Sequence, residues 1–345
     1  MADWTDSDIP WQHGRTAVIT GTGGLGFEDA LALARAGAHV ILAGRSPSKG
    51  AAAVERIRAS VLDAHVTFEA LDLASLASIE AFAERLRHSL HSLDLLINNA
   101  GVMTPPKRQV TSDGFELQFG TNYLGHFALT AHLLPLLRQA AMPRVVSLSS
   151  IAAPQGVIHF DDLQSERAYN PMVAYGQSKL ACLMFAFELQ RRSDAAGWGL
   201  QSIAAHPGVS RTELLPNGAG TWSGMGIFRR LFWFLFQPAA QGALPTLFAA
   251  TSPQAKGGVY YGPDKLRELR GYPTEAKIPP QALDMASAAR LWRESERLTG
   301  VVFPLSEEQG SGGSFSMTPA DRRVSSFQRS DIPTYRGAIS DLQAN

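Results

Sequence analysis

Tyr175 and Lys179 are the residues whose types and spacing most directly suggest chemistry in this chain. They lie four positions apart in a helical pattern, so their side chains are expected on one face of the helix. An ammonium group held beside a phenol favours the phenolate form, and a phenol tuned in this way can act as a general acid or base. A tyrosine and a lysine at this spacing also occur on ordinary surface helices, so the pair alone predicts no active site.

Hydroxyl and amide side chains follow two of the predicted strands. Ser150 comes soon after the strand predicted over 144–148, and Asn99 follows the strand predicted over 93–97. The carboxyl ends of parallel strands share one edge of a sheet, and open α/β sheets bind ligands at that edge. These side chains are therefore candidates for the same site as the tyrosine and the lysine.

Asn122 is a polar residue inside an apolar stretch that predicts a long helix over 115–137. Its amide must find hydrogen-bond partners there, so it is a further candidate for the site. The alternative is a local distortion of the helix in which water satisfies the amide.

A cluster of glycines lies between a predicted strand at 16–20 and a predicted helix at 27–36. This strand–glycine–helix order places backbone N–H groups and a helix N-terminus where a pyrophosphate can bind. Glycine allows the backbone to approach the ligand closely and to adopt positive φ angles. The alternative is a tight structural turn. The residues of this loop that are candidates to contact the cofactor are Gly21, Gly23, Gly24, Leu25 and Gly26.

The end of the second predicted strand indicates which dinucleotide binds. A carboxylate at this place would accept from the ribose 2′-OH and select NAD, but the sequence has Arg45 and no acid. An arginine can instead pair with the 2′-phosphate of NADP. NADP(H) is therefore expected rather than NAD(H), unless Arg45 is simply an exposed surface residue. Asp72, after the third strand, is a candidate to accept from the adenine amino group or to cap the next turn.

Strands alternate along the chain with helices of about ten residues or more. This order requires crossover connections and predicts a doubly wound α/β fold, Rossmann-type, with a parallel sheet covered on both faces. The sequence divides into an N-terminal arm over 1–13, one catalytic domain over 14–303, and a polar, Gly/Ser-rich flexible tail over 304–345. The predicted strands are 16–20, 39–43, 66–71, 93–97, 144–148, 200–205 and 258–261. The predicted helices are 27–36, 51–62, 79–90, 115–137, 173–192 and 242–250.

Charge and composition exclude several classes of function. The chain has 31 Lys and Arg against 31 Asp and Glu, so no net field attracts nucleic acid. The single cysteine, Cys182, excludes an intrachain disulfide, and no ligand spacing predicts a metal site. The sequence has no secretory signal pattern and no apolar run long enough to span a membrane, so a cytoplasmic location is expected.

The aromatic segment 227–236 has two interpretations of equal weight. In the first interpretation the segment serves a function, as a wall for a lipophilic substrate or as an interfacial helix that gives peripheral membrane contact. In the second it is structural and is buried in the core or in a dimer interface. The oligomeric state is left open. His126 and His206 lie in apolar elements and are interpreted as core histidines rather than catalytic acids.

Taken together, these motifs resemble the short-chain dehydrogenase/reductase family. The resemblance rests on Thr20–Gly26, Asn98–Gly101, Thr121–Phe127, Ser149-Ser150, Tyr175-x-x-x-Lys179 and His206–Gly208, in that order. Phe160–Leu163 and Ala174–Ala181 resemble its retinol-dehydrogenase-like branch. The match covers about residues 14–300, and the glycine loop is one residue shorter than the usual family pattern.

The resemblance implies a role for each matched residue. Tyr175 would be the general acid or base, and Lys179 would favour its phenolate and hold the nicotinamide ribose. Ser150 would bind the substrate oxygen, and Asn122 would hold a water for proton relay. Pro207–Val209 would close over the nicotinamide. The expected cofactor contacts are Gly21, Gly23, Gly24, Leu25, Gly26, Arg45, Asp72, Leu73, Asn99, Ala100, Gly101, Tyr175, Lys179, Pro207, Gly208, Val209 and Thr212.

The sequence therefore predicts an NADP(H)-dependent oxidoreductase that interconverts an alcohol and a carbonyl compound without a metal. The aromatic segment favours a small-molecule substrate that is lipophilic. One alternative is the reduction of an activated C=C bond, as in the related protochlorophyllide reductases. Another is a non-catalytic NADP(H)-binding sensor, for which the shortened glycine loop is the support.

Overall fold

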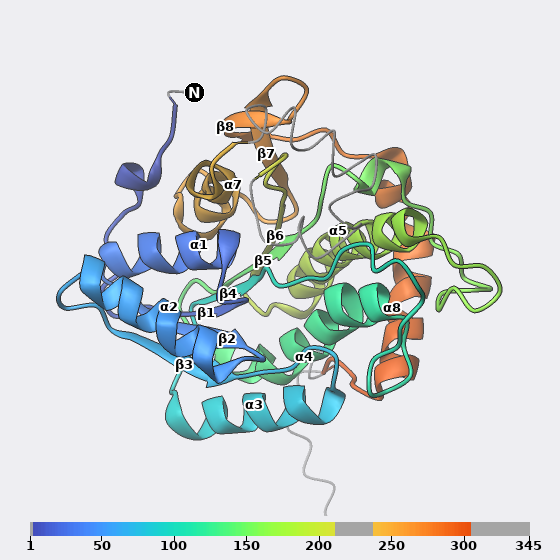
Figure 1. The fold of residues 1–345 in the computed structure, drawn as a ribbon, viewed down its shortest axis with the longest axis horizontal. Coiled ribbons are helices and arrows are strands. Elements are labelled where there is room, and N and C mark those ends of the chain that lie inside the picture. The colour runs from blue at the N-terminus through green and yellow to red at the C-terminus, as the bar shows by residue number, and fades with distance from the viewer. Residues whose placement is uncertain (1–2, 211–236, 305–345) are drawn as a thin grey trace, which may run out of the picture. The chain divides into compact units, whose positions relative to one another are not determined.

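An eight-stranded sheet runs through the chain in the computed structural model, which describes residues 3–210 and 237–304 (Figure 1). The strand order is β3-β2-β1-β4-β5-β6-β7-β8, and all neighbours are parallel except β7 and β8. The predicted doubly wound, Rossmann-type fold is thus confirmed. The strands are β1 (Thr16–Thr20), β2 (His39–Gly44), β3 (Val66–Ala70), β4 (Leu95–Asn98), β5 (Arg144–Leu148), β6 (Gln201–Ala205), β7 (Tyr260–Lys265) and β8 (Arg270–Glu275).

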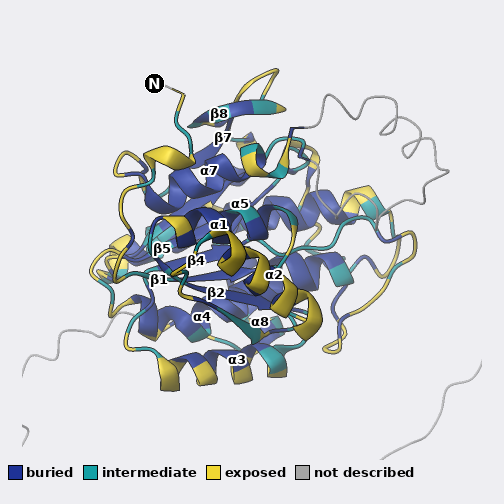
Figure 2. Cartoon of the chain, turned by 60° about the vertical axis from the view of Figure 1, so that its left-hand side comes forward, coloured by how far each residue is buried: buried dark blue, intermediate teal, exposed yellow. Residues whose placement is uncertain are grey.

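Helices cover both faces of the sheet, which explains why its central strands are apolar on both sides. Leu33, Ile57 and Phe248 belong to the core on one face, and Phe82, Leu129 and Leu183 belong to the core on the other. Figure 2 shows the central strands buried and the outer faces of α2 and α3 exposed. The first face carries α1 (Gly24–Arg35), α2 (Pro47–Ser60) and α7 (Ala239–Thr251). The second carries α3 (Leu76–Ser89), α4 (Gly125–Leu137) and α5 (Pro171–Ala196).

The structure corrects the long helix predicted over 115–137. A π-helix occupies Phe119–Leu124, and α4 begins only at Gly125. The π-helix contains Asn122, whose side chain bonds to a neighbouring loop rather than to solvent. Single π-helical turns are rare and are often found at functional sites.

Two elements in the C-terminal part of the described chain were not predicted. β8 contains Gly271 and Pro273, which weaken any strand pattern in a sequence, but it pairs with β7 as an edge strand. The amphipathic helix α8 (Met285–Thr299) begins at the N-cap Asp284 and buries Leu291 and Trp292. α8 packs beside α5 and completes the core on that face.

The N-terminal arm packs against the catalytic domain in its described part. The Gln12 backbone N–H donates to Ala36 O, and the Trp4 ring packs edge-on against Phe248. Three predictions fall on residues that lie outside the described ones: the cofactor contact Thr212, the aromatic segment 227–236, and the tail 304–345 apart from Pro304. No helix within 3–210 or 237–304 has the length and apolar character needed to cross a membrane.

Candidate active site

A cavity of about 530 Å³ opens at the carboxyl ends of β1, β2, β3 and β4. The strand order reverses between β1 and β4, and such a reversal creates the crevice in which doubly wound folds bind ligands. Among the predicted cofactor contacts, the cavity is lined by Gly21, Gly23, Gly24, Leu25, Arg45, Asp72, Leu73, Asn99, Ala100 and Gly101. The sequence analysis missed the other lining residues, namely Thr22, Ala43, Gly44, Ser46, Lys49, Leu71, Val102, Met103, Pro105, Gln109, Leu117 and Thr121.

The glycine loop leaves no room for side chains on its inner side. Gly21 has φ +96°, and a Cβ there would lie 2.9 Å from Asn99 Nδ2. A Cβ on Gly26 would lie 2.6 Å from the same atom and would meet Gly21 O. Asn99 Nδ2 donates to Thr20 O at 2.7 Å and so fixes the loop from behind. This cradle at the start of α1 fits a dinucleotide pyrophosphate, although the loop is one residue shorter than usual.

Two cations lie where β2 ends and α2 begins. Arg45 and Lys49 both line the cavity and are exposed, and no carboxylate follows β2. Ser46 caps α2, because its Oγ accepts from the Lys49 backbone N–H at 3.3 Å. This arrangement is suited to an anion such as a ribose phosphate. The sequence analysis missed Lys49 because the helix predicted over 51–62 begins two residues after it, whereas α2 begins at Pro47.

Asp72 takes the capping role, one of the two roles that the sequence left open. Its Oδ1 accepts from the Ala74 backbone N–H at 3.0 Å and thereby caps the turn after β3. The residue also lines the cavity.

The helix α5 positions Tyr175 and Lys179. Asn170 caps it by accepting from two backbone N–H groups, and the following residues form a continuous buried face. Tyr175 is 7% exposed, and Lys179 Nζ lies 6.0 Å from the centre of its ring. Lys179 Nζ donates to Leu148 O at 3.0 Å, which ties this helix to the end of β5.

The two serines after β5 have separate contacts. Ser149 is buried, and its Oγ donates to Lys179 O at 2.8 Å. Ser150 is only partly buried, and its Oγ accepts from the Ala152 backbone N–H at 3.2 Å. Ser149 therefore supports α5, and Ser150 is the serine that stands closer to solvent.

Asn122 and Lys179 both lie next to Gly101 at the edge of the cavity. Its Oδ1 accepts from Val102 N at 2.7 Å, and its Nδ2 donates to Val102 O and to Ser178 Oγ, each at 3.0 Å. A Cβ on Gly101, which lines the cavity, would lie 3.1 Å from Asn122 Oδ1 and 3.7 Å from Lys179 Nζ. The helix is distorted here, as the alternative interpretation expected, but protein groups rather than water satisfy the amide.

Comparison with known proteins identifies the family. Residues 15–219 match the family profile described as short chain dehydrogenase. The chain belongs to the short-chain dehydrogenase family. It is 42% identical to retinol dehydrogenase 13 of Homo sapiens over 303 residues, which cover 86% of this chain and 88% of that protein. It is 40% identical to polyprenol dehydrogenase of Mus musculus over 305 residues, with coverage of 86% and 88%.

A solved structure shares the fold closely. An uncharacterised protein from Mycobacterium paratuberculosis is 41% identical to this short-chain dehydrogenase and has a TM-score of 0.74. It covers 88% of this chain and all of its own. A short chain dehydrogenase from Shigella flexneri, complexed with NADP, has a TM-score of 0.57 at 22% identity, which supports the fold alone. The relatives place the chain in the retinol-dehydrogenase-like branch of oxidoreductases.

Not every predicted residue of this short-chain dehydrogenase lines the cavity. Gly26 supports the glycine loop from beneath. Pro207–Val209 follow β6, the strand next to β5, and their backbone is held by Leu269. The residues predicted to be catalytic, Tyr175, Lys179, Ser150 and Asn122, do not line the cavity either, and Gly101 joins two of them to it.

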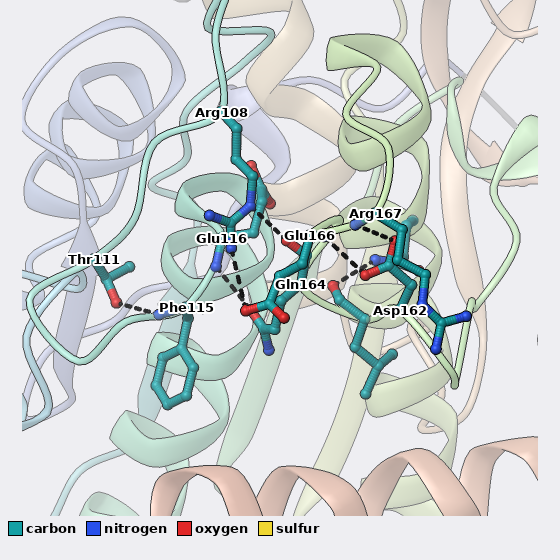
Figure 3. Close-up of polar contacts among 10 residues, drawn as sticks. Arg108, Thr111, Phe115, Glu116, Asp162, Gln164, Glu166 and Arg167 are labelled. Carbon is teal, nitrogen blue, oxygen red and sulfur yellow. Dashed lines mark hydrogen bonds and ion pairs between the residues drawn. The ribbon is translucent and has the colours of Figure 1, made fainter.

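The branch motif Phe160–Leu163 lies in a loop that packs against the loop after β4 (Figure 3). Arg108 Nε donates to Gln164 O at 2.9 Å, and Gln164 Oε1 accepts from Glu116 N at 2.7 Å. Glu116 is buried, and burial raises the pKa of its carboxyl group, while its Oε2 accepts from Phe119 N. These bonds fix the start of the π-helix, and sequence reasoning missed all of them.

His126 connects Asn122 to the glycine loop. Its Nδ1 lies 2.9 Å from Asn122 O, and its Nε2 lies 2.9 Å from Thr20 Oγ1. A carbonyl oxygen only accepts, so Nδ1 carries the proton and Nε2 accepts from the threonine hydroxyl. Thr20 Oγ1 in turn accepts from the backbone N–H groups of Asn99 and Ala100. His126 is thus a satisfied core histidine, as interpreted from the sequence.

His126 is expected to make the protein acid-sensitive. Burial lowers its pKa from 6.5 to about 4, so the unfolded chain binds a proton between these pH values and the folded chain does not. Stability is therefore complete above pH 6.5 and is lost as pH falls toward 4. From about pH 7.5 to about pH 5, this residue should cost about 2 kcal/mol of unfolding free energy. His126→Gln should flatten that slope in denaturant titrations.

The control for this experiment is His88→Gln, which removes an exposed imidazole from α3 without touching the core. A His126→Gln protein with the same loss between the two pH values as the wild type would contradict the assignment.

Proposed function

We propose that the protein is an NADP(H)-dependent oxidoreductase that interconverts an alcohol and an aldehyde or ketone of lipophilic character. The observation that carries this proposal is the convergence at Gly101, which lines the glycine-rich cavity and borders both Asn122 Oδ1 and Lys179 Nζ. The glycine loop, the segment after β4, the π-helix and α5 are distant in sequence. In this proposal they bring the dinucleotide cradle and the candidate proton-transfer group together.

In this proposal Tyr175 transfers a proton to or from the substrate oxygen. NADP(H), when bound, supplies or accepts the hydride at its nicotinamide ring. Lys179, on the same helix face as Tyr175, holds the nicotinamide ribose, and Ser150 donates a hydrogen bond to the substrate oxygen as charge develops there. Asn122 holds the segment that follows β4 through its bonds to Val102, and in this proposal its Oδ1 also accepts from a water that relays protons.

The substrate class is proposed from the relatives. Retinol dehydrogenase 13 and polyprenol dehydrogenase are named for alcohols with long apolar isoprenoid chains. We extend that property to this chain, because both relatives align with more than four-fifths of it.

The proposed function is tested by following NADPH oxidation with a series of aldehydes of increasing apolar chain length, including retinal. The expected result is reduction of the carbonyl group to the alcohol, with kcat/KM rising with chain length. Product analysis distinguishes this from reduction of a C=C bond. Tight NADPH binding without turnover of any carbonyl compound would favour the alternative function, a non-catalytic sensor that binds NADP(H).

Arg45→Ala is expected to weaken NADPH binding by roughly ten- to a hundredfold, because a charge-assisted bond to the 2′-phosphate is lost. NADH has no 2′-phosphate, so its affinity should change less than about twofold. Lys49→Ala should act in the same direction. Fluorescence titration of both cofactors measures the effect.

Arg138→Ala is the matched control, because it removes an exposed arginine after α4 that does not line the cavity. Equal losses for NADPH and NADH in the Arg45 variant would contradict the choice of NADP(H).

A further inference from the structure

The segment Pro207–Val209 rests on the connection between β7 and β8. Val209 N donates to Leu269 O at 2.8 Å. Gly208 has φ +61°, and a Cβ there would meet Leu269 O and would lie 2.9 Å from Glu268 O. The backbone of this segment therefore touches the hairpin connection directly, and its position depends on where that connection stands.

His206 and Glu268 link the same two segments through their side chains. His206 is 1% exposed, and its Nδ1 accepts from Gly208 N at 3.2 Å. Since Nδ1 accepts, the ring proton is on Nε2, which donates to Glu268 Oε2 at 3.1 Å. The other oxygen, Oε1, accepts from Lys277 N at 2.8 Å. Both carboxylate oxygens are thus used, and the bond from His206 lowers the pKa of Glu268.

The connection itself has an unusual backbone. Leu266, Arg267 and Glu268 have φ angles of +51°, +56° and +67°, which residues other than glycine rarely adopt. Three such residues in succession persist only where the surroundings hold them, and strain of this kind gathers at functional sites. The bonds of Glu268 to His206 and to Lys277 N supply that restraint on both sides of its carboxylate.

We propose that His206 and Glu268 are a positioning pair, which holds the Pro207–Val209 segment in the position that the nicotinamide half of the cofactor requires. Glu268 acts through His206 and through the Leu269 carbonyl, and it does not touch the substrate. The inference rests on the proposed function, in which this segment closes over the nicotinamide. It adds a residue that the sequence analysis did not single out, about sixty positions along the chain from the segment that it holds.

Glu268→Gln tests the pair. Glutamine has one carbonyl oxygen, so its amide N–H₂ must face either the His206 N–H or the Lys277 N–H, and one bond is lost. We expect kcat and NADPH affinity to fall by about tenfold. Adenosine 2′,5′-bisphosphate, the adenosine half of NADP, should bind the variant as it binds the wild type, because it does not reach this segment. Hydrogen exchange at Gly208 and Val209 should accelerate.

Glu275→Gln is the matched control, because it makes the same change at an exposed position on β8. The double variant His206→Asn/Glu268→Gln should bind NADPH no more weakly than whichever single variant, His206→Asn or Glu268→Gln, binds it less tightly. Both substitutions break the same His206–Glu268 hydrogen bond, so their effects should not add. Equal losses for NADPH and the adenosine half would indicate general damage and overturn the inference. So would a Glu268→Gln protein that behaves like Glu275→Gln. Wild-type protein that binds no NADPH would instead overturn the proposed function.

Discussion

Replacing Tyr175 with phenylalanine is expected to lower kcat for carbonyl reduction by about 10²–10⁴-fold, the usual contribution of a positioned acid or base. NADPH affinity should change by less than about threefold, because the ring stays in place and keeps its packing on α5. The side chain is 7% exposed, so phenylalanine fits the same space. Steady-state kinetics and fluorescence titration on one preparation separate the two effects.

Tyr272→Phe is the control, since it removes a phenol hydroxyl from β8 at a position that does not line the cavity. A Tyr175→Phe enzyme with wild-type kcat would show that another group transfers the proton. A large loss of NADPH affinity would show that the hydroxyl serves the cofactor rather than the chemistry.

Gly26→Ala is expected to weaken NADP(H) binding by roughly ten- to a hundredfold, the equivalent of about 1–3 kcal/mol of overpacking. The added methyl group would meet Gly21 O and lie 2.6 Å from Asn99 Nδ2, so the glycine loop must move. Asn99 would then lose its bond to Thr20 O, which fixes the loop. Calorimetric titration with NADP measures the affinity.

Gly197→Ala is the control for this change. Gly197 caps α5 at φ +63° with nothing within 4 Å of its added Cβ, so alanine costs about 1 kcal/mol of stability and leaves the cofactor site alone. If Gly26→Ala bound NADP(H) as the wild type does, the cavity at β1–β4 would not be the cofactor site.

The sequence alone determined the features that depend on local patterns. Apolar strands and the helices between them predicted a parallel sheet, and six of its seven parallel strands were placed to within about two residues. The glycine loop was found because strand, glycines and helix follow one another within a short stretch. Tyr175 and Lys179 were found because side chains four apart share a helix face whatever the rest of the chain does.

Contacts between residues distant in the sequence depend on how the whole chain folds. The π-helix forms because Asn122 bonds to Val102 and Ser178, which lie 20 and 56 positions away, and no local pattern encodes those contacts. The strand β8 is stabilised by pairing with β7 in spite of its glycine and proline. Glu268 could be identified only from its hydrogen bond to His206 in the folded structure. A single glutamate in a loop carries no sequence pattern that indicates a distant partner.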